Sequence, residues 1–347
     1  MAAIPFPTLR TERLLLRVPR VEDTETIVGY RSDPEIARYQ DWEMPYDAER
    51  GAEKIAKCAE QGGPVVDGGW NLTIATPDDS EVVGDLYCGL TWGGRSAEIG
   101  YTLASGFHGH GYATEAAGEL IRWLFEDVEG IGRIESSLDP LNVASAAVLE
   151  RLGFEFEGQQ RKAFWVGDEN SDDGRYGLLR SDWEEWNARP KGAPESVQLV
   201  EITEANQHAV RKLRVHRSQE QNVAPVVASM ADALFPEIID GAPVVPWMRA
   251  VEADGELAGF VMIAEVTEAH PEPYLWRLLV DRRHQRRGVG ERIIELVVDK
   301  VRADGATSLL TSYVEGKGSP KGFYAGLGFV ETGEIVDDET EARLTLS

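Results

Sequence analysis

The feature that most constrains the fold is an internal repeat, because one unit of supersecondary structure occurs twice along the 347-residue chain. In each half, a glycine-containing turn precedes an amphipathic helix, and a short strand, a short helix and the tripeptide Leu-Gly-Phe follow it. The glycines of the tripeptides, Gly153 and Gly328, are 175 positions apart, and the second glycines of the turns, Gly111 and Gly290, are 179 apart. The sequence therefore predicts two copies of a strand, turn, helix, strand, helix, strand unit.

Chain length and composition place a domain boundary between the copies. A chain of 347 residues is more than twice as long as a typical domain of about 150 residues. Residues 187–196 are rich in Pro, Gly, Ala and Ser, which is typical of a linker. We therefore predict domains at 1–190 and 191–347, with the boundary near Lys191. The polar, glycine-containing stretch 167–176 is expected to be a hairpin loop near the end of the first domain.

The net charge narrows the possible partners. The formal net charge is −25 at pH 7, which disfavours nucleic acid or an anionic membrane and suits a cationic substrate. The alternative is a diffusely acidic surface that only maintains solubility. The sequence shows no apolar run of about 18 residues and no basic-then-apolar leader, so we expect a cytoplasmic protein. Cys58 and Cys88 match no metal-ligand spacing, and neither do the histidines beside the turns, so we expect no metal.

The turn of the second copy is suited to a bulky anion. An apolar strand at 272–281 precedes the turn and a helix follows it, so unpaired amides and the helix dipole favour negative charge there. Gly288 and Gly290 let the backbone approach the anion without a Cβ in the way. Arg286 and Arg287 add cationic donors. The pattern therefore predicts a pyrophosphate site.

Two segments of the second half resemble the GNAT family of N-acetyltransferases. The sequence Gln-Arg-Arg-Gly-Val-Gly at 285–290 is similar to the acyl-CoA pyrophosphate loop of the family, and Tyr-Ala-Gly-Leu-Gly-Phe at 324–329 is similar to its Tyr-x-x-Leu-Gly-Phe segment. This half is most similar to bacterial diamine and spermidine N-acetyltransferases. The first half resembles the branch that acetylates the N termini of ribosomal proteins. The segments that carry this second resemblance are 9–27, 97–105, 109–116 and 142–154.

The resemblance implies an α/β protein with two GNAT-like domains, each a mixed, mostly antiparallel twisted sheet flanked by helices. It implies an acyl-CoA-dependent N-acyltransferase that moves an acetyl group to a primary amine, with acetyl-CoA or another acyl-CoA as co-substrate. Together with the charge, it favours a small cationic acceptor, such as a polyamine, an aminoglycoside-like molecule or an amine of secondary metabolism. The duplication supplies the contact that single-domain relatives obtain by dimerising, so a monomer is expected.

The resemblance also implies cofactor contacts in both copies. In the second copy these are Leu279, Val280, Gln285, Arg286, Arg287, Gly288, Val289 and Gly290. In the first copy they are Thr102, Leu103, His108, Gly109, His110, Gly111, Tyr112, Ala113 and Asn142. Thr102 and Gly106 depart from the usual residues of the family, which leaves the strength of cofactor binding in the first copy open.

Catalytic residues follow from the same resemblance. Tyr324 stands where the family keeps a tyrosine that protonates the CoA sulfur, and a phenol with an ordinary pKa of about 10 is protonated at pH 7. Leu149 replaces this tyrosine in the first copy, where the branch uses Ser145 as the acid. Glu98, on the strand beside the first turn, is the candidate base. The structural alternatives are that Tyr324 is a core aromatic, that Ser145 and Asn142 cap a helix, and that Glu98 is merely solvated.

Several questions stay open in the sequence. The base of the second copy is Glu237, Glu272, Glu315 or water, and Lys317 stands where the first copy has Asn142. We expect the second domain to hold the more active site. One alternative is that the first domain acetylates the α-amine of a protein or peptide. Another is a non-catalytic pseudo-dimer that binds acetyl-CoA without turnover.

Overall fold

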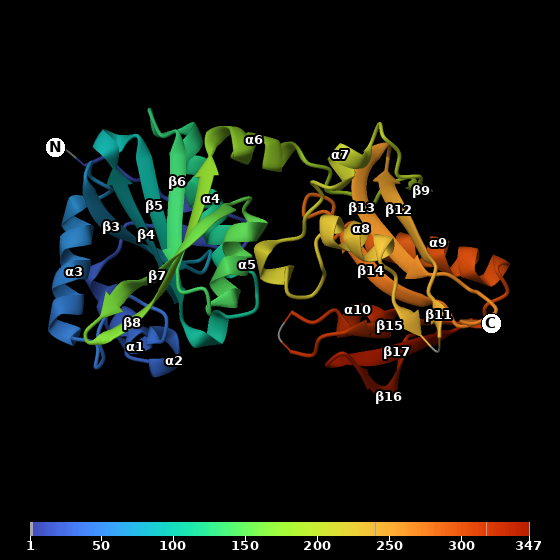
Figure 1. The fold of residues 1–347 in the computed structure, drawn as a ribbon. Coiled ribbons are helices and arrows are strands. Elements are labelled where there is room, and N and C mark those ends of the chain that lie inside the picture. Colours follow the sequence, from blue (N-terminus) through green and yellow to red (C-terminus); the bar gives the residue numbers. More distant parts are fainter. Residues whose placement is uncertain (1–2, 240, 317, 347) are drawn as a thin grey trace. The chain divides into compact units, whose positions relative to one another are not determined.

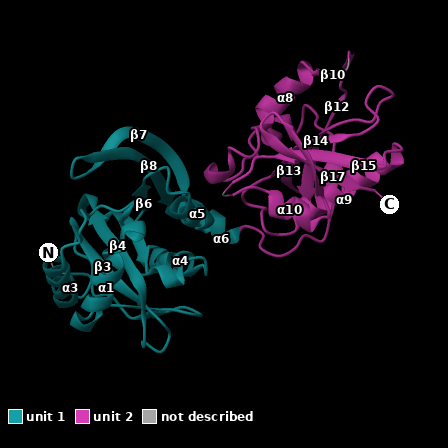
Figure 2. Cartoon of the chain, turned by 90° about the horizontal axis from the view of Figure 1, so that it is seen from below, with its two compact units in different colours: residues 1–188 teal, residues 189–347 magenta. Residues whose placement is uncertain are grey.

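The computed structural model describes residues 3–239, 241–316 and 318–346 of the chain. They form two compact units, residues 1–188 and residues 189–347, which Figure 2 distinguishes by colour. Each unit is a mixed, mostly antiparallel sheet flanked by helices (Figure 1), so the expected fold class is confirmed. Among the described helices, none has the length and apolar character needed to cross a bilayer.

Unit 1 is built on an eight-stranded sheet. Its strands are β1 (Leu9–Arg10), β2 (Leu15–Arg17), β3 (Gly68–Ala75), β4 (Val82–Thr91), β5 (Ser96–Leu103), β6 (Arg133–Leu138), β7 (Glu155–Val166) and β8 (Glu169–Leu179). They lie in the order β1-β2-β3-β4-β5-β6-β8-β7. β5 and β6 pair in parallel, whereas β5 with β4 and β6 with β8 are antiparallel pairs.

The helices of unit 1 flank this sheet. They are α1 (Thr24–Arg31), α2 (Pro34–Ala37), α3 (Ala48–Gln61), α4 (Tyr112–Glu126), α5 (Val143–Arg151) and α6 (Arg180–Ala188). The side chain of Asp47 accepts a hydrogen bond from the amide of Arg50 at 3.0 Å and so caps α3, which ends at Gly62 with φ 69°. Leu120 and Leu124 of α4, one helical turn apart, are fully buried in the core that α4 forms with the sheet.

Unit 2 is built on a seven-stranded sheet and a separate two-stranded one. The strands of the large sheet are β9 (Val197–Val200), β12 (Pro246–Ala253), β13 (Glu256–Ala264), β14 (Tyr274–Val280), β15 (Ser308–Tyr313), β16 (Val330–Val336) and β17 (Glu339–Thr345). Their order is β16-β17-β15-β14-β13-β12-β9, and β14 and β15 pair in parallel. Asp254 and Gly255, with φ values of 55° and 81°, form the two-residue turn between β12 and β13.

The remaining elements of unit 2 flank the large sheet. They are α7 (Gln207–Val210), α8 (Val226–Leu234), β10 (Ile238–Ile239), β11 (Ala242–Pro243), α9 (Val289–Ala303) and α10 (Lys321–Gly326). Val297 and Val301 of α9, one turn apart, are fully buried in the core of this unit. α9 therefore has the same packing role in unit 2 as α4 has in unit 1.

The structure corrects the register in which the two turns correspond. α4 begins directly after Gly111 and α9 directly after Gly288, and both glycines are left-handed, with φ values of 80° and 81°. Gly111 therefore corresponds to Gly288, 177 positions on, and the predicted match with Gly290 is wrong. Gly290 lies inside the first turn of α9, where a Cβ would be 3.2 Å from the ring of Phe323. The connection between α9 and β15 is two residues shorter than the one between α4 and β6. The spacing between equivalent residues therefore falls from 177 to 175, the value found at Leu-Gly-Phe.

Two predicted loops are shorter than expected. In the stretch 167–176 only the first two residues form the turn, because pairing of Val166 with Glu169 already starts β8. In the stretch 187–196, the first two residues end α6. Ser196 is bound to Asp254 by two hydrogen bonds of 3.0 Å, one from its amide to Oδ1 and one from the Asp254 amide to its carbonyl. Composition alone does not reveal these long-range partners.

Candidate active site

In both units the two parallel strands part at their carboxyl ends. The last parallel pair of β5 lies at Glu98, and the strand continues to Leu103. The last parallel pair of β14 lies at Leu275, and that strand continues to Val280. Backbone groups on such a segment are available to an extended ligand that carries amides. The predicted cofactor contacts on these segments are Thr102, Leu103, Leu279 and Val280.

The two turns have the same backbone shape. In unit 1, Gly109 and Gly111 have φ values of 79° and 80°. In unit 2, Arg286 and Gly288 have φ values of 62° and 81°. Both turns lead directly into a 15-residue helix, whose first amides lack partners within the helix. The geometry is that of an anion site, and the predicted contacts Gly109, His110, Gly111, Tyr112, Ala113, Arg286, Gly288, Val289 and Gly290 lie on it.

The first residue of each turn ties the turn to the end of its strand. In unit 1, Nε2 of His108 lies 3.0 Å from the carbonyl oxygen of Leu103. In unit 2, Nε2 of Gln285 donates to the carbonyl oxygen of Val280 at 3.1 Å. His108 and Gln285 are 177 positions apart and both reach back five residues, so they hold equivalent positions. The sequence suggested both residues as cofactor contacts but not this shared role.

An arginine that sequence reasoning missed supports the turn of unit 1. Arg13 donates to the carbonyl oxygen of His110 at 3.0 Å and forms a 2.6 Å ion pair with Glu115 in the first turn of α4. Its guanidinium also lies 4.7 Å from the ring centre of Tyr112. In the same turn, Oγ1 of Thr114 is buried and has no hydrogen-bond partner among the described groups. An unsatisfied hydroxyl beside free helix amides suits an oxygen-rich anion.

The guanidinium of Arg287 is held inside unit 2. It donates from Nε to the carbonyl oxygen of Gly192 at 2.7 Å and from Nη2 to Asp254 at 3.2 Å. Nη1 lies 2.9 Å from Nδ1 of His284, whose pKa is lowered by burial. These bonds occupy the side chain of Arg287. The prediction that Arg287 contacts the pyrophosphate is therefore limited to its backbone amide.

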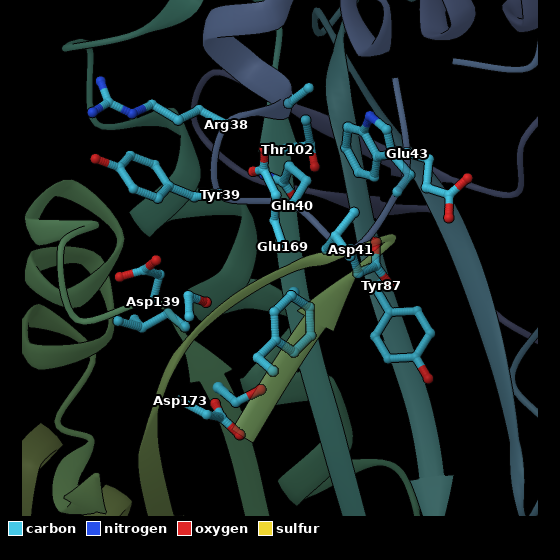
Figure 3. Close-up of a pocket in the computed structure, with 18 of the residues that line it drawn as sticks. Arg38, Tyr39, Gln40, Asp41, Glu43, Tyr87, Thr102, Asp139, Glu169 and Asp173 are labelled. Atoms are coloured by element: carbon cyan, nitrogen blue, oxygen red, sulfur yellow. The ribbon is translucent and has the colours of Figure 1, made fainter. Parts of the chain in front are cut away.

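Unit 1 contains a large acidic cleft beside the point where β5 and β6 part. The cleft has a volume of about 1480 Å³ and lies between the segment 38–44, strands β4 and β5, and the β7–β8 hairpin (Figure 3). Among the described residues, nine carboxylates line it: Asp41, Glu43, Asp85, Glu98, Asp139, Asp168, Glu169, Asp172 and Asp173. The basic residues described along it are Arg31, Arg38 and Lys54. The surplus of negative charge favours a cationic ligand.

Glu98 joins the cleft to the end of the parallel pairing. Burial raises the pKa of its carboxyl group, and the charge of Glu135 on β6 raises it further. A carboxylate with a raised pKa holds a proton more strongly, as a general base requires. Tyr87 on β4 also lines the cleft, and burial together with the charge of Glu98 raises its pKa to about 12. The predicted base therefore lines the cleft.

A buried polar cluster in the lining of the cleft positions one of its walls. Asp85 accepts hydrogen bonds from Arg31 at 2.6 Å, from Asn71 at 2.9 Å and from the hydroxyl of Tyr30. The Arg31 guanidinium lies 4.5 Å from the ring centre of Trp42, whose indole donates to the Arg31 carbonyl oxygen at 3.1 Å. The cluster therefore anchors the segment 38–44 to the sheet. Sequence reasoning missed it because Asp85 lies 14 to 55 positions from the three residues that donate to it.

Ser145 lies in the first turn of α5 against a tyrosine of β5. Asn142 caps this helix, because its Oδ1 accepts from the amide of Ser145 at 3.2 Å. The hydroxyl of Tyr101 donates to the carbonyl oxygen of Ser145 at 2.8 Å and lies 2.9 Å from its Oγ. The cap uses the backbone amide of Ser145, whereas the contact with Tyr101 uses its hydroxyl. Asn142 can therefore cap the helix while Ser145 stays a candidate acid.

Tyr324 is buried in an aromatic cluster of unit 2. Its ring stacks on Tyr313 at 5.9 Å and meets Phe323 and Phe329 edge-on. Burial raises the pKa of its phenol to about 12, so the group is protonated at neutral pH. Leu149 holds the equivalent position in unit 1 and is fully buried. The aromatic packing and the predicted proton donation are compatible.

The candidate bases of unit 2 differ in their surroundings. Glu272 forms a 2.7 Å ion pair with Arg343, and although burial opposes it, this pairing lowers the pKa of Glu272. Glu315 pairs with Lys321 at 3.1 Å, and Glu237 is exposed. Lys317 lies outside the described residues. Glu272, whose pKa is lowered by its cationic partner, is therefore poorly suited to accept a proton.

Comparisons with known proteins agree with this architecture. A model described as "Acetyltransferase (GNAT) domain" matches residues 13–155, and one described as "Acetyltransferase (GNAT) family" matches residues 212–329. The chain belongs to the GNAT acetyltransferase family and carries two of its domains in tandem. It is an N-acetyltransferase with acetyl-CoA as the acetyl donor, as the resemblance implied.

Individual relatives each match about half of the chain. "Uncharacterized N-acetyltransferase p20" of Bacillus licheniformis is 34% identical over 159 residues, which are 44% of this chain and 85% of the relative. The ribosomal protein uS5-alanine N-acetyltransferase of Escherichia coli (strain K12) is 24% identical over 189 residues, 52% of this chain and 94% of the relative. Among solved structures, an acetyltransferase (GNAT family) from Bacillus anthracis is 25% identical, with a TM-score of 0.45, and covers 50% of this chain and 99% of its own.

The residues of unit 1 fit acetyl-CoA. The left-handed turn, the helix amides and the unpartnered hydroxyl of Thr114 suit a pyrophosphate. The segment of β5 beyond Glu98 suits an amide-bearing arm. Unit 2 repeats the turn and the free strand segment.

Proposed function

We propose that unit 1 transfers the acetyl group of acetyl-CoA to the primary amine of a small cationic molecule. The observation that carries the proposal is the acidic cleft, because nine carboxylates against three basic residues surround the place where β5 and β6 part. An ammonium-bearing molecule gains favourable electrostatic energy in such a cleft, whereas an anion is repelled. Acceptors with two or more amino groups, such as polyamines and aminoglycosides, have the charge that the cleft favours.

Each step of the transfer has a candidate group in unit 1. Acetyl-CoA supplies an acetyl thioester. Glu98 accepts the proton that the amine loses as the new C–N bond forms, and backbone groups of β5 beyond Glu98 orient the thioester carbonyl. Ser145 donates a proton to the sulfur as the C–S bond breaks. The transfer is direct, and no acyl-enzyme forms.

Two further proposals concern the whole chain. We propose a cytoplasmic protein, and a monomer in which the two units replace the two subunits of a dimer. Sedimentation at micromolar concentration tests the second proposal, because a stable dimer would contradict it. The alternative, expected from the sequence, is that unit 2 is the more active unit through Tyr324, whose buried phenol is protonated at neutral pH.

The test is CoA release from acetyl-CoA with a panel of amines: a polyamine, an aminoglycoside, a neutral monoamine and an acidic amino acid. Turnover of the polycations is expected to be lost in Ser145→Ala and retained in Tyr324→Phe. The reverse pattern would place the chemistry in unit 2. Equal turnover of cationic and acidic acceptors would contradict the role of the cleft.

A matched pair of charge variants isolates the cleft. Asp41→Asn with Glu169→Gln removes two of its exposed carboxylates. Surface charge contacts contribute about 0.2–1 kcal/mol each, so KM for a dication is expected to rise roughly three- to tenfold, while kcat changes little. Glu22→Gln with Glu129→Gln removes the same charge from exposed positions elsewhere on unit 1 and is the control. Equal effects of the two pairs would mean that only the net charge matters.

The second candidate acceptor is the N-terminal amine of a basic protein. The named activity of the uS5-alanine N-acetyltransferase of E. coli favours it, and a cleft of about 1480 Å³ is larger than the usual small-ligand pocket of about 300–1,000 Å³. A basic peptide that begins with alanine, included in the same assay, separates the two candidates. Peptide turnover without polyamine turnover would replace the first proposal by the second.

A further inference from the structure

We propose that Tyr101 is a positioning residue of unit 1 that orients the hydroxyl of Ser145 and resupplies its proton. This inference rests on the proposed function of Ser145 as the acid. Tyr101 lies on β5, three residues beyond the last parallel pair, and it lines the acidic cleft. Ser145 is not among the described residues that line the cleft. Tyr101 therefore both lines the cleft and contacts the Ser145 hydroxyl.

Two hydrogen bonds define the pair. The Tyr101 hydroxyl donates to the carbonyl oxygen of Ser145 at 2.8 Å, so the Ser145 hydroxyl is left to donate to the phenol oxygen across 2.9 Å. Both hydrogens can rotate about their C–O bonds without movement of heavy atoms. When the Ser145 hydroxyl turns towards the leaving sulfur, the Tyr101 hydroxyl can turn from the carbonyl to Oγ of Ser145.

The proton transfers balance along this path. The C–S bond breaks, the sulfur keeps the electron pair, and the proton of the Ser145 hydroxyl neutralises it. The Tyr101 hydroxyl then gives its proton to the Ser145 oxygen. A water in the cleft returns one proton to Tyr101 and takes up the proton that Glu98 received from the amine, so no charge is left over. Burial raises the pKa of the Tyr101 phenol, so it carries its proton at neutral pH and is ready to donate.

A comparison of the two units supports the assignment, because a phenol and a leucine exchange places. Tyr101 of β5 corresponds to Leu278 of β14, 177 positions on. Leu149 of α5 corresponds to Tyr324 of α10, 175 positions on. In each unit both positions contact the same core. Each unit therefore keeps one phenol behind the parting strands, supplied by the strand in unit 1 and by the helix in unit 2.

A double-mutant cycle on the full-length protein tests the proposal, with Tyr324→Phe as the background so that unit 2 contributes little. Tyr101→Phe removes only the hydroxyl and is expected to lower kcat about 10- to 100-fold, with KM for acetyl-CoA within about threefold. Ser145→Ala is expected to lower kcat at least as much. The double variant is expected to match Ser145→Ala within about threefold, because Tyr101 acts through Ser145.

Tyr30→Phe is the matched control, since it removes another buried phenol from unit 1 that binds Asp85 instead of Ser145. The fold-reductions in kcat caused by Tyr30→Phe and by Ser145→Ala should multiply in the double variant, because the two residues act independently. Melting curves of all variants show whether each one is folded. Multiplying effects of Tyr101→Phe and Ser145→Ala, or an unchanged kcat in Tyr101→Phe, would overturn the proposal.

The readout separates this proposal from the proposed function. If the wild type acetylates no cationic amine, the proposed acceptor is wrong, and the same cycle is measured on the slow hydrolysis of acetyl-CoA, which needs the same sulfur protonation. Non-multiplying effects on hydrolysis would still support the role of Tyr101. A wild type that neither transfers nor hydrolyses would overturn both proposals.

Discussion

Breaking the buried Arg31–Asp85 ion pair in the lining of the cleft is expected to destabilise unit 1 and to loosen the cleft wall. The side chains of Asp85 and Arg31 are 4% and 7% exposed, and Asp85 is the partner of three donors. Removing one member of a buried pair costs about 3–5 kcal/mol, because the other charge is left without a partner. Arg31 also lines the cleft, where water can reach it, so we expect the lower end for Asp85→Asn, about 3 kcal/mol.

The assay is denaturant unfolding followed by tryptophan fluorescence. Seven of the nine tryptophans lie in unit 1, so the signal reports mainly on that unit. Arg31→Met, Asp85→Asn and the double variant form a cycle, and we expect a coupling energy of at least about 2 kcal/mol. Arg31→Met should also raise KM for the amine, because Trp42 loses the cation on which it stacks.

The control is an ion pair on the outer face of α4. Arg122 and Glu119, with side chains 35% and 19% exposed, lie 2.8 Å apart. Exposed pairs of this kind couple by about 0.2–1 kcal/mol. If Arg31 and Asp85 coupled no more strongly than Arg122 and Glu119, the reasoning from burial would be refuted.

Three further predictions concern the chemistry and the turns. Glu98→Gln is expected to lower kcat about 10²- to 10⁴-fold, measured as CoA release at saturating amine; a loss below threefold would exclude Glu98 as the base. Glu135→Gln removes a charge that raises the pKa of Glu98, so the acidic limb of the pH–rate profile is expected to move to lower pH, and an unmoved limb would contradict the pairing. His108→Gln should keep KM for acetyl-CoA within about threefold, because Gln285 makes the same bond in unit 2, whereas His108→Ala should raise it about tenfold. Equal effects of the two His108 variants would refute the tie.

The sequence predicted the repeat and the two turns because their signals are local. Glycines mark the turns, and three- and four-residue spacings mark the helices that follow. The match between the turns failed by two residues, because the second turn offers two glycines. Which of them starts the helix depends on which adopts the left-handed conformation, and only Gly288 does.

The rest of the site could not be predicted because it is built from distant partners. Tyr101 and Ser145 are 44 positions apart, and Arg13 and Glu115 are 102 apart. The cleft depends on how the β7–β8 hairpin and the segment 38–44 approach the sheet, which no local pattern contains. The partners of the Arg287 side chain could not be predicted for the same reason, since they are Asp254 and a carbonyl of the predicted linker.

The contacts of Arg287 have a practical consequence for anyone who wishes to produce the units separately. Residues 192–196 are held by unit 2, because Arg287 in the turn before α9 donates to the carbonyl of Gly192 and Asp254 in the β12–β13 turn binds Ser196. A polypeptide that starts at β9 would leave a buried guanidinium short of an acceptor beside the turn. The useful place to divide the gene is therefore between the codons for Ala188 and Gly192.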